Sequence, residues 1–141
     1  MRYTRIRYAW ADPVAVAGGW FRVSMVVEVV ETSGLYELSA GIAYVSGPST
    51  VFTVDWYPGV WHPKGIHVLK SIGLKKGEHR VDARVAFPEK GLHTLRLETV
   101  VFRHNPRLGR AVYEVDSYTT RYVVVVPETW RRKVATAALT S

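Results

Sequence analysis

The sequence predicts an all-β protein, folded as a two-sheet antiparallel β-sandwich with about seven to nine strands. Apolar and polar residues alternate in one segment after another, which is the pattern of half-buried strands. Valine dominates the apolar residues and aromatic residues make up 12% of the chain, and both kinds of side chain suit a pleated sheet. Clusters of Gly, Pro and Ser separate the segments, and 141 residues suit one domain with a single core.

Alternation places the strands of the first half of the chain. We expect them at residues 3–10, 20–31, 36–44 and 51–55. Ile6, Tyr8 and Trp10 would share one face of the first strand. A turn signal separates the second strand from the third, so we expect these two to pair as a hairpin.

The second half repeats this pattern with longer strands. They are expected at residues 66–72, 77–87, 92–103 and 110–126. The short break Pro88–Gly91 favours a hairpin over residues 77–103. The last segment exceeds the usual strand length, so a bulge is expected near residues 116–120. Pro127 ends it, which leaves one domain over residues 1–126 and a basic tail, 127–141, that is either a short helix or irregular.

One part of the chain resembles a known architecture. The charged alternating strand, the corner FPEKG and the strand LHTLRLE resemble the E and F strands of immunoglobulin-like sandwiches, and are most similar to fibronectin type III and CARDB-type domains. Many of these folds have a Tyr at this corner that bonds back to the backbone, and the resemblance puts His93 in its place. It covers residues 20–126 and implies the fold alone, because such folds host many functions. A jelly roll is the alternative topology.

The formal net charge of +7 favours association with phosphates, anionic lipid or acidic proteins. Most of the excess comes from arginine, which suits phosphate, surface ion networks and protein interfaces alike. The basic residues form three groups, namely Arg2, Arg5 and Arg7, then Arg103, Arg107 and Arg110, and finally Arg131, Arg132 and Lys133.

The chain has no Cys and no Gln, and Asn105 is its single Asn. Without thiols there are no disulfides, thiolate metal sites or cysteine nucleophiles. The shortage of thermolabile residues favours a heat-adapted source. Asp12 and Pro13 interrupt the apolar residues near the N-terminus, so no signal peptide or membrane span is expected, and we expect a cytoplasmic protein or a virion component.

The first candidate binding site is the aromatic loop over residues 55–64. Its candidate residues are Trp56, Tyr57, Trp61 and His62. Exposed rings of this kind stack on sugars or unpaired bases, or contact a protein partner. The simpler interpretation is that the rings seal the open end of the sandwich.

The second candidate site is the loop after the strand 92–103. Arg103, His104, Arg107 and Arg110 bracket it, and their guanidinium groups are suited to phosphate. Nucleic acid would then bind with an affinity that falls steeply with salt.

No residue is assigned to catalysis, a metal or a cofactor. The segment WHPKGIHVLKSIGL, with His62 and His67, faintly resembles the histidine segment of superoxide reductases, but that family needs a Cys ligand that this chain lacks. No nucleophile elbow or phosphate loop occurs, and the carboxylates lie opposite arginines as they do on solvated sheet faces.

These observations predict a non-enzymatic module that acts by contact, as an interaction or assembly subunit with a protein partner or with its own copies. A basic protein that binds nucleic acid or another polyanion is the second hypothesis. A sugar-binding sandwich is the third.

Overall fold

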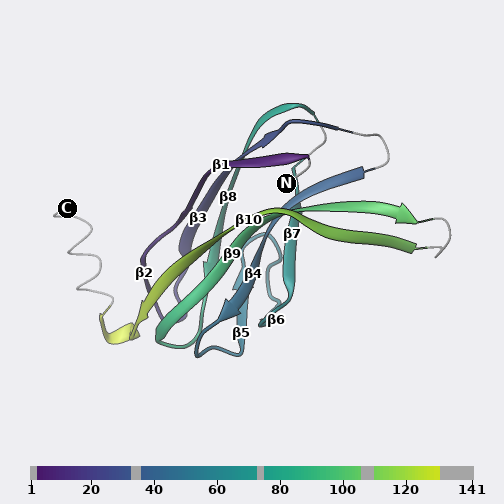
Figure 1. Cartoon of the computed structure of the whole chain (residues 1–141). Helices are drawn as coiled ribbons and strands as arrows, with labels where there is room; N and C mark the ends of the chain where they lie inside the picture. Colours follow the sequence, from purple (N-terminus) through teal and green to yellow (C-terminus); the bar gives the residue numbers. More distant parts are fainter. Residues whose placement is uncertain (1–2, 33–35, 73–74, 106–109, 131–141) are drawn as a thin grey trace.

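The computed structural model describes residues 3–32, 36–72, 75–105 and 110–130. These residues form strands and one short 3-10 helix (Figure 1). The strands are β1 (Thr4–Ala11), β2 (Val14–Val16), β3 (Phe21–Val29), β4 (Tyr36–Ser46), β5 (Val51–Val54), β6 (His62–Pro63), β7 (His67–Ser71), β8 (Gly77–Ala86), β9 (Gly91–Asn105) and β10 (Arg110–Val126), and the 3-10 helix is η1 (Glu128–Trp130).

The strands form two five-stranded sheets that pack face to face. Sheet I has the order β1-β3-β8-β5-β6, and sheet II has the order β2-β10-β9-β4-β7. The β2–β10 pair is parallel, and the other pairs between described strands are antiparallel. The orders β1-β3-β8-β5 and β10-β9-β4 are those of a constant-type immunoglobulin sandwich. The predicted all-β sandwich is therefore confirmed.

The core lies between the sheets, where the alternation places it. On β3 the predicted apolar face, from Phe21 to Val29, is buried at every second residue. On β8 the inward residues Ala83 and Val85 are buried, while Arg84 between them is exposed. The aromatic rings of Tyr44, Phe52 and Phe87 pack together at one end of this core. These faces were correctly predicted from the sequence.

Both predicted hairpins are wrong. The strand 20–31 corresponds to β3, which pairs with β1 and β8, whereas 36–44 corresponds to β4, which pairs with β7 and β9. Similarly, β8 belongs to sheet I and β9 to sheet II, so the break between them carries the chain from one sheet to the other. Alternation identifies which face of a strand is apolar, but a short connection fits a crossover between sheets as well as a hairpin.

The face prediction for β1 is also wrong, because the strand contains a bulge. Its register on β3 shifts between Ile6 and Tyr8. Residues beyond the shift therefore change sides: Tyr8 and Trp10 are exposed, and Ala9 is buried. The chain then crosses from sheet I to sheet II, where the unpredicted strand β2 pairs with β10.

The bulge expected in the last strand is confirmed. The register of β10 on β9 shifts between Val115 and Ser117. At this point Thr4 of β1 donates its backbone N–H to Asp116 Oδ2 at 2.8 Å, and its Oγ1 lies 2.7 Å from Thr99 Oγ1. Ser117 Oγ donates to the Thr4 carbonyl at 3.0 Å. The bulge thus joins the two sheets by hydrogen bonds.

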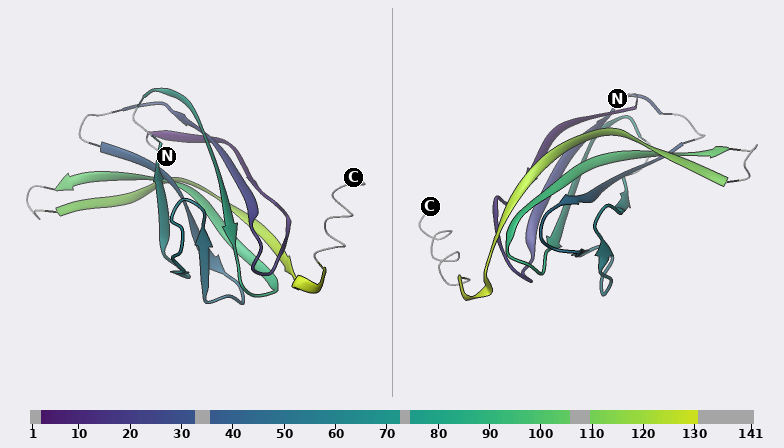
Figure 2. Two further views of the ribbon diagram at one scale, coloured as in Figure 1. Left: turned by 180° about the vertical axis from the view of Figure 1, so that it is seen from behind. Right: turned by 60° about the horizontal axis from the view of Figure 1, so that its bottom comes forward.

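The far ends of β9 and β10 project beyond the other strands (Figures 1 and 2). Pro127 ends β10 as predicted, and η1 follows it. The rest of the predicted basic tail, residues 131–141, lies outside the described residues. Within the described part of the chain, no helix is long and apolar enough to cross a membrane.

Candidate functional site

Trp56, the first residue of the predicted aromatic loop, is part of the structural support of the core. It packs against the main core cluster, and its Nε1 donates a hydrogen bond to the Leu69 carbonyl at 3.2 Å. The hydrogen bond joins the loop after β5 to β7 of sheet II. Trp56 therefore contributes to the packing of the core, and its role in binding stays a prediction.

The other rings of this loop lie nearer the surface. Tyr57 and Trp61 are about half exposed. The His62 ring lies tilted against Phe52 at 5.6 Å between centroids, and it meets the Tyr57 ring edge-on at 5.3 Å. Burial lowers the pKa of His62, whose Nε2 is buried without a described hydrogen-bond partner. Tyr57 and His62 are therefore in contact, Trp61 is exposed beside them in the chain, and the role of all three in binding stays a prediction.

The second predicted site lies on the projecting ends of β9 and β10. The backbone of Arg103 pairs with Val112, and that of Arg110 pairs with Asn105. His104 pairs with Ala111 in the same ladder. The side chains of Arg103, His104 and Arg110, and all of Arg107, lie outside what the structure describes, so phosphate binding here also stays a prediction.

A surface that the sequence did not single out is the outer face of sheet II. Tyr113, Tyr118 and Tyr122 of β10 are 53%, 62% and 62% exposed, and they point away from the core. Leu92 and Val124, a cross-strand pair on the same face, are also exposed. We call these five residues the tyrosine row. An exposed group of large apolar side chains of this kind is typical of an interaction surface.

Beside the tyrosine row, the outer face holds a buried carboxylate, that of Glu98 on β9. Its side chain is completely buried, hydrogen-bonds with His67 Nδ1 through Oε1, and accepts a hydrogen bond from Arg96 Nε at 3.0 Å through Oε2. Arg96 in turn lies over the Tyr118 ring, 5.2 Å from its centroid. The carboxylate therefore fixes a cation that supports one ring of the row.

The register explains how His67 reaches Glu98. His67 on β7 pairs with Ala43 of β4, and Glu98 on β9 pairs with Gly41 of the same strand. Both β4 residues are small, so the His67 ring can reach across that strand. Glycine is required at position 41, because a Cβ there would lie 2.5 Å from both Leu69 Cδ2 and the Val68 carbonyl oxygen.

A shallow groove of about 300 Å³ adjoins this cluster. It is lined by Gly65, Ile66, His67, Leu69, Phe102 and Tyr113. The His67 ring meets the Tyr113 ring edge-on at 6.0 Å between centroids. Apart from the imidazole the lining is largely apolar, so the groove suits an apolar side chain with a polar end.

His93 is a buried structural residue at the other end of the sandwich. Its Nδ1 donates to the Gly91 carbonyl at 3.0 Å, and its Nε2 accepts from Ser49 Oγ at 3.0 Å. A neutral ring that donates through Nδ1 accepts at Nε2, so Ser49 Oγ is the donor there, and the same oxygen accepts the Glu89 N–H at 3.1 Å. The bond to Gly91 is the return to the backbone that the resemblance implied for His93.

Stability should fall as the pH falls below about 6.5, because burial lowers the pKa values of His93 and His62. Above that pH both rings are neutral in the folded and unfolded chains. Below that pH the unfolded chain binds protons more readily than the folded chain. Each ring therefore lowers the free energy of unfolding by up to about 1.4 kcal/mol per pH unit, until the pH reaches the pKa of that ring in the folded protein. Histidine NMR titrations should give midpoints below 6.5 for both rings, and a midpoint at or above that value would contradict the assignment.

Among the described residues, no three His, Asp or Glu side chains lie close enough together to hold a metal ion.

The outer-face residues of sheet II could in part have been found from the sequence. Arg96 and Glu98 alternate with the core residue Leu97, and Tyr118 and Tyr122 fall on one side of a strand. The contact of Glu98 with His67 depends on the register of both strands on β4, which no local sequence pattern specifies.

Comparisons with known proteins reach the level of architecture. No protein-family model matches the chain, and no curated protein matches its sequence. Among solved structures, a cohesin module from a Clostridium perfringens family 33 glycoside hydrolase is similar, with 15% identity, a TM-score of 0.47 and coverage of 89% of this chain and 97% of that one. These likenesses concern the fold alone.

Two further structures are similar at the same level. A conjugative transposon lipoprotein from Bacteroides eggerthii has 9% identity and a TM-score of 0.45, covering 85% of this chain and 93% of its own. AggA, the major subunit of aggregative adherence fimbriae type I from Escherichia coli, has 13% identity and a TM-score of 0.37, covering 87% of this chain and 95% of its own. None of the three identifies a site or partner in this chain.

Proposed function

We propose that this protein is a non-enzymatic assembly module whose copies associate through the outer face of sheet II. The observation that carries the proposal is the tyrosine row, whose Tyr113, Tyr118 and Tyr122 are each more than half exposed along one strand. Tyr and Arg are enriched in protein interfaces, and a Tyr ring buries a large area with little loss of conformational freedom. Arg96, already held by Glu98, is a preorganised member of such a surface.

Charge favours a second copy as the occupant of this face. The protein carries a formal charge of +7, so most of its surface repels another copy. On this face, by contrast, Arg96 is matched by Glu98. Two such faces can therefore meet around a twofold axis without repulsion between like charges, and twofold dimers are the commonest symmetric assemblies.

The area of this face determines the affinity that we expect for the dimer. From Tyr113 to Val124, β10 extends about 35 Å, and a face two to three strands wide covers roughly 500 Å². Two copies would then bury roughly 1,000 Å², which is the lower end for a specific interface. The groove beside His67 adds a depression that can receive a side chain from the second copy. We expect a dimer of micromolar affinity.

The double variant Tyr118→Ser/Tyr122→Ser is expected to be monomeric at concentrations where the wild type sediments as a dimer. Truncating central aromatic residues typically costs 2 kcal/mol or more each, which is about a thirtyfold loss of affinity per residue. Sedimentation velocity over a concentration series measures this directly. Circular dichroism should show that the variant retains its strands.

The matched control is Tyr57→Ser/Trp61→Ser, which removes two rings of similar exposure from the loop. This control should still dimerise. A wild type that stays monomeric throughout the series, or a control that dissociates as readily as the first variant, would contradict the proposal. Retention of the monomeric wild type on a polysaccharide matrix would instead favour the sugar-binding hypothesis.

The proposal takes residues 1–126 as one domain, as the sequence predicts. The shortage of Cys, Gln, Asn and Met supports a heat-adapted source, and an assembly subunit of this kind would suit a particle or virion.

A further inference from the structure

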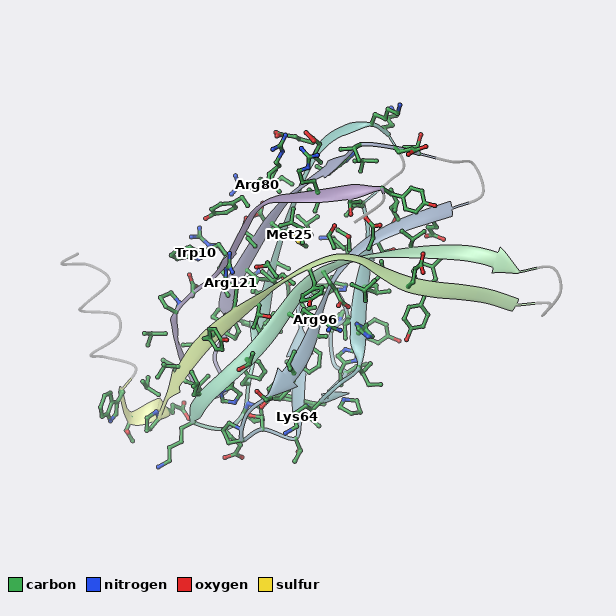
Figure 3. The ribbon with its side chains drawn as sticks, in the orientation of Figure 1. Trp10, Met25, Lys64, Arg80, Arg96 and Arg121 are labelled. Carbon is green, nitrogen blue, oxygen red and sulfur yellow. The ribbon has the colours of Figure 1, made fainter. Side chains whose placement is uncertain are left out.

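A second surface lies where the edge of sheet I meets sheet II. Strand β1 runs beside β10 there, and between them is an open groove of about 400 Å³. It is lined by Arg5, Ile6, Arg7, Tyr8, Ala9, Ser117, Tyr118, Thr119 and Arg121. Figure 3 shows Arg121 beside Trp10 in this region, between β1 and β10. Its size is that of a site for a small ligand or part of a chain.

The groove carries excess positive charge. Arg5 and Arg7 share a single partner, Glu28, at 3.9 Å and 3.0 Å. Both side chains remain nearly half exposed, so they are available to a ligand. No carboxylate lines the groove among the residues that the structure describes. Two arginines share one carboxylate, so an anion in the groove would meet net attraction.

Arg121 is held in place by neutral groups. Its Nε donates to the Ala9 carbonyl at 3.1 Å, and Nη1 donates to Thr119 Oγ1 at 3.0 Å and to the Thr120 carbonyl at 2.8 Å. These bonds orient the guanidinium without neutralising it. Its Nη2 has no hydrogen bond to a described residue and is free to donate to an anion.

Two aromatic rings border the charged groups. Tyr8 is 48% exposed and Tyr118 is 62% exposed. The β1 bulge between Ile6 and Tyr8 is what places Arg7 and Tyr8 side by side on the exposed surface. Exposed rings beside guanidinium groups are the combination that binds unpaired nucleic acid, since the rings stack on bases and the cations contact phosphates.

We propose that the β1–β10 groove binds single-stranded nucleic acid, with Arg5, Arg7 and Arg121 on the phosphates and Tyr8 stacking on a base. A sulfated polymer would use the arginines but would not contact the face of the Tyr8 ring, and a folded acidic protein would not need a flat ring in an open groove. The four residues with these roles lie outside the dimer face, so the site does not depend on the proposed assembly.

The test is binding of a fluorescent oligo(dT) of about 15 nucleotides, followed by anisotropy at about 50 mM salt and upward. Three phosphate contacts predict a slope of about −2 for the logarithm of the association constant against the logarithm of salt concentration. The variant Arg5→Ala/Arg7→Ala should bind about tenfold more weakly at low salt and have a shallower slope. Tyr8→Ala should lose about fivefold to a hundredfold.

Matched controls separate the groove from general charge. Arg80→Ala/Arg84→Ala lowers the net charge from +7 to +5, as Arg5→Ala/Arg7→Ala does, and its arginines are exposed and paired with Asp82 and Asp55 on the outer face of sheet I. This control, and Tyr57→Ala for the ring, should bind almost as the wild type does.

Three results would overturn the proposal. The first is no binding at low salt. The second is an equal loss in both arginine variants, which would mean attraction by net charge alone. The third is weaker binding in Arg5→Ala/Arg7→Ala with no change in Tyr8→Ala, which would mean a polyanion surface without base stacking. Sedimentation of Arg5→Ala/Arg7→Ala should still show the dimer, so failure here is distinguishable from failure of the assembly proposal.

Discussion

Replacing Glu98 by alanine is expected to lower the free energy of unfolding by about 3 kcal/mol. Glu98 is completely buried on the outer face of sheet II, where it bonds to His67 and Arg96. Alanine would remove both bonds, leave a cavity, and leave the His67 ring and the Arg96 cation without their common partner. The expected loss of stability is at the lower end of the range that is usual for breaking a buried ion pair, because Arg96 is about one-third exposed. Chemical denaturation measures the loss.

Glu28→Ala is the control for this prediction. Glu28 also contacts two cations, Arg5 and Arg7, but these contacts are near the surface, and its removal should cost no more than about 1 kcal/mol. Glu98→Gln keeps the shape and an acceptor oxygen, so its loss should fall between the two. Equal losses for Glu98→Ala and Glu28→Ala would show that the buried carboxylate has no special structural role.

Gly47→Ala is expected to destabilise the protein by at least about 3 kcal/mol. Gly47 has a φ of 145°, which side-chain-bearing residues rarely adopt, and a Cβ there would lie 2.5 Å from Tyr44 Oη and 3.1 Å from His93 Cα. Relieving this clash would displace Tyr44, whose hydroxyl accepts the Ser49 N–H at 3.0 Å. The corner that positions His93 would be disrupted as well. Thermal and chemical unfolding would both show the loss.

Gly59→Ala separates backbone strain from the clash. Gly59 also has a positive φ, 78°, but a Cβ there would meet nothing within 4 Å. Its cost should be limited to about 1–2 kcal/mol of left-handed strain. If Gly47→Ala proved no worse than Gly59→Ala, the close packing around the Tyr44 hydroxyl would not be a determinant of stability.

The faces of regular strands were predictable because each is a local property. Every second residue from Phe21 to Val29 enters the core, as a period of two requires. A bulge removes that regularity. One extra residue near Ile6 reversed the prediction for Tyr8 and Trp10, and nothing in the apolar pattern marks where it occurs. The bulge of β10, by contrast, could be predicted because the segment 110–126 is longer than a usual strand.

Strand partners and site geometry were not predictable because they are long-range. Ser49 and His93 are separated by 44 residues and His67 and Glu98 by 31, and neither pair has a sequence motif. The tyrosine row was overlooked for a related reason. A run of apolar residues like that near the end of β10 is typical of a strand covered on both faces, whereas Tyr122 and Val124 are exposed. Which face of a sheet is covered depends on the whole fold.

The parallel pairing of β2 with β10 also affects how the fold bears mechanical load. These strands lie near opposite ends of the described chain, and both run in the same direction along sheet II. A pull on the two ends would slide one strand along the other, so the hydrogen bonds between them would be loaded together instead of opening one at a time. The pairs of residues 14–16 with residues 124–126 would therefore resist such a pull together within sheet II, which would suit a subunit that carries tension within an assembly.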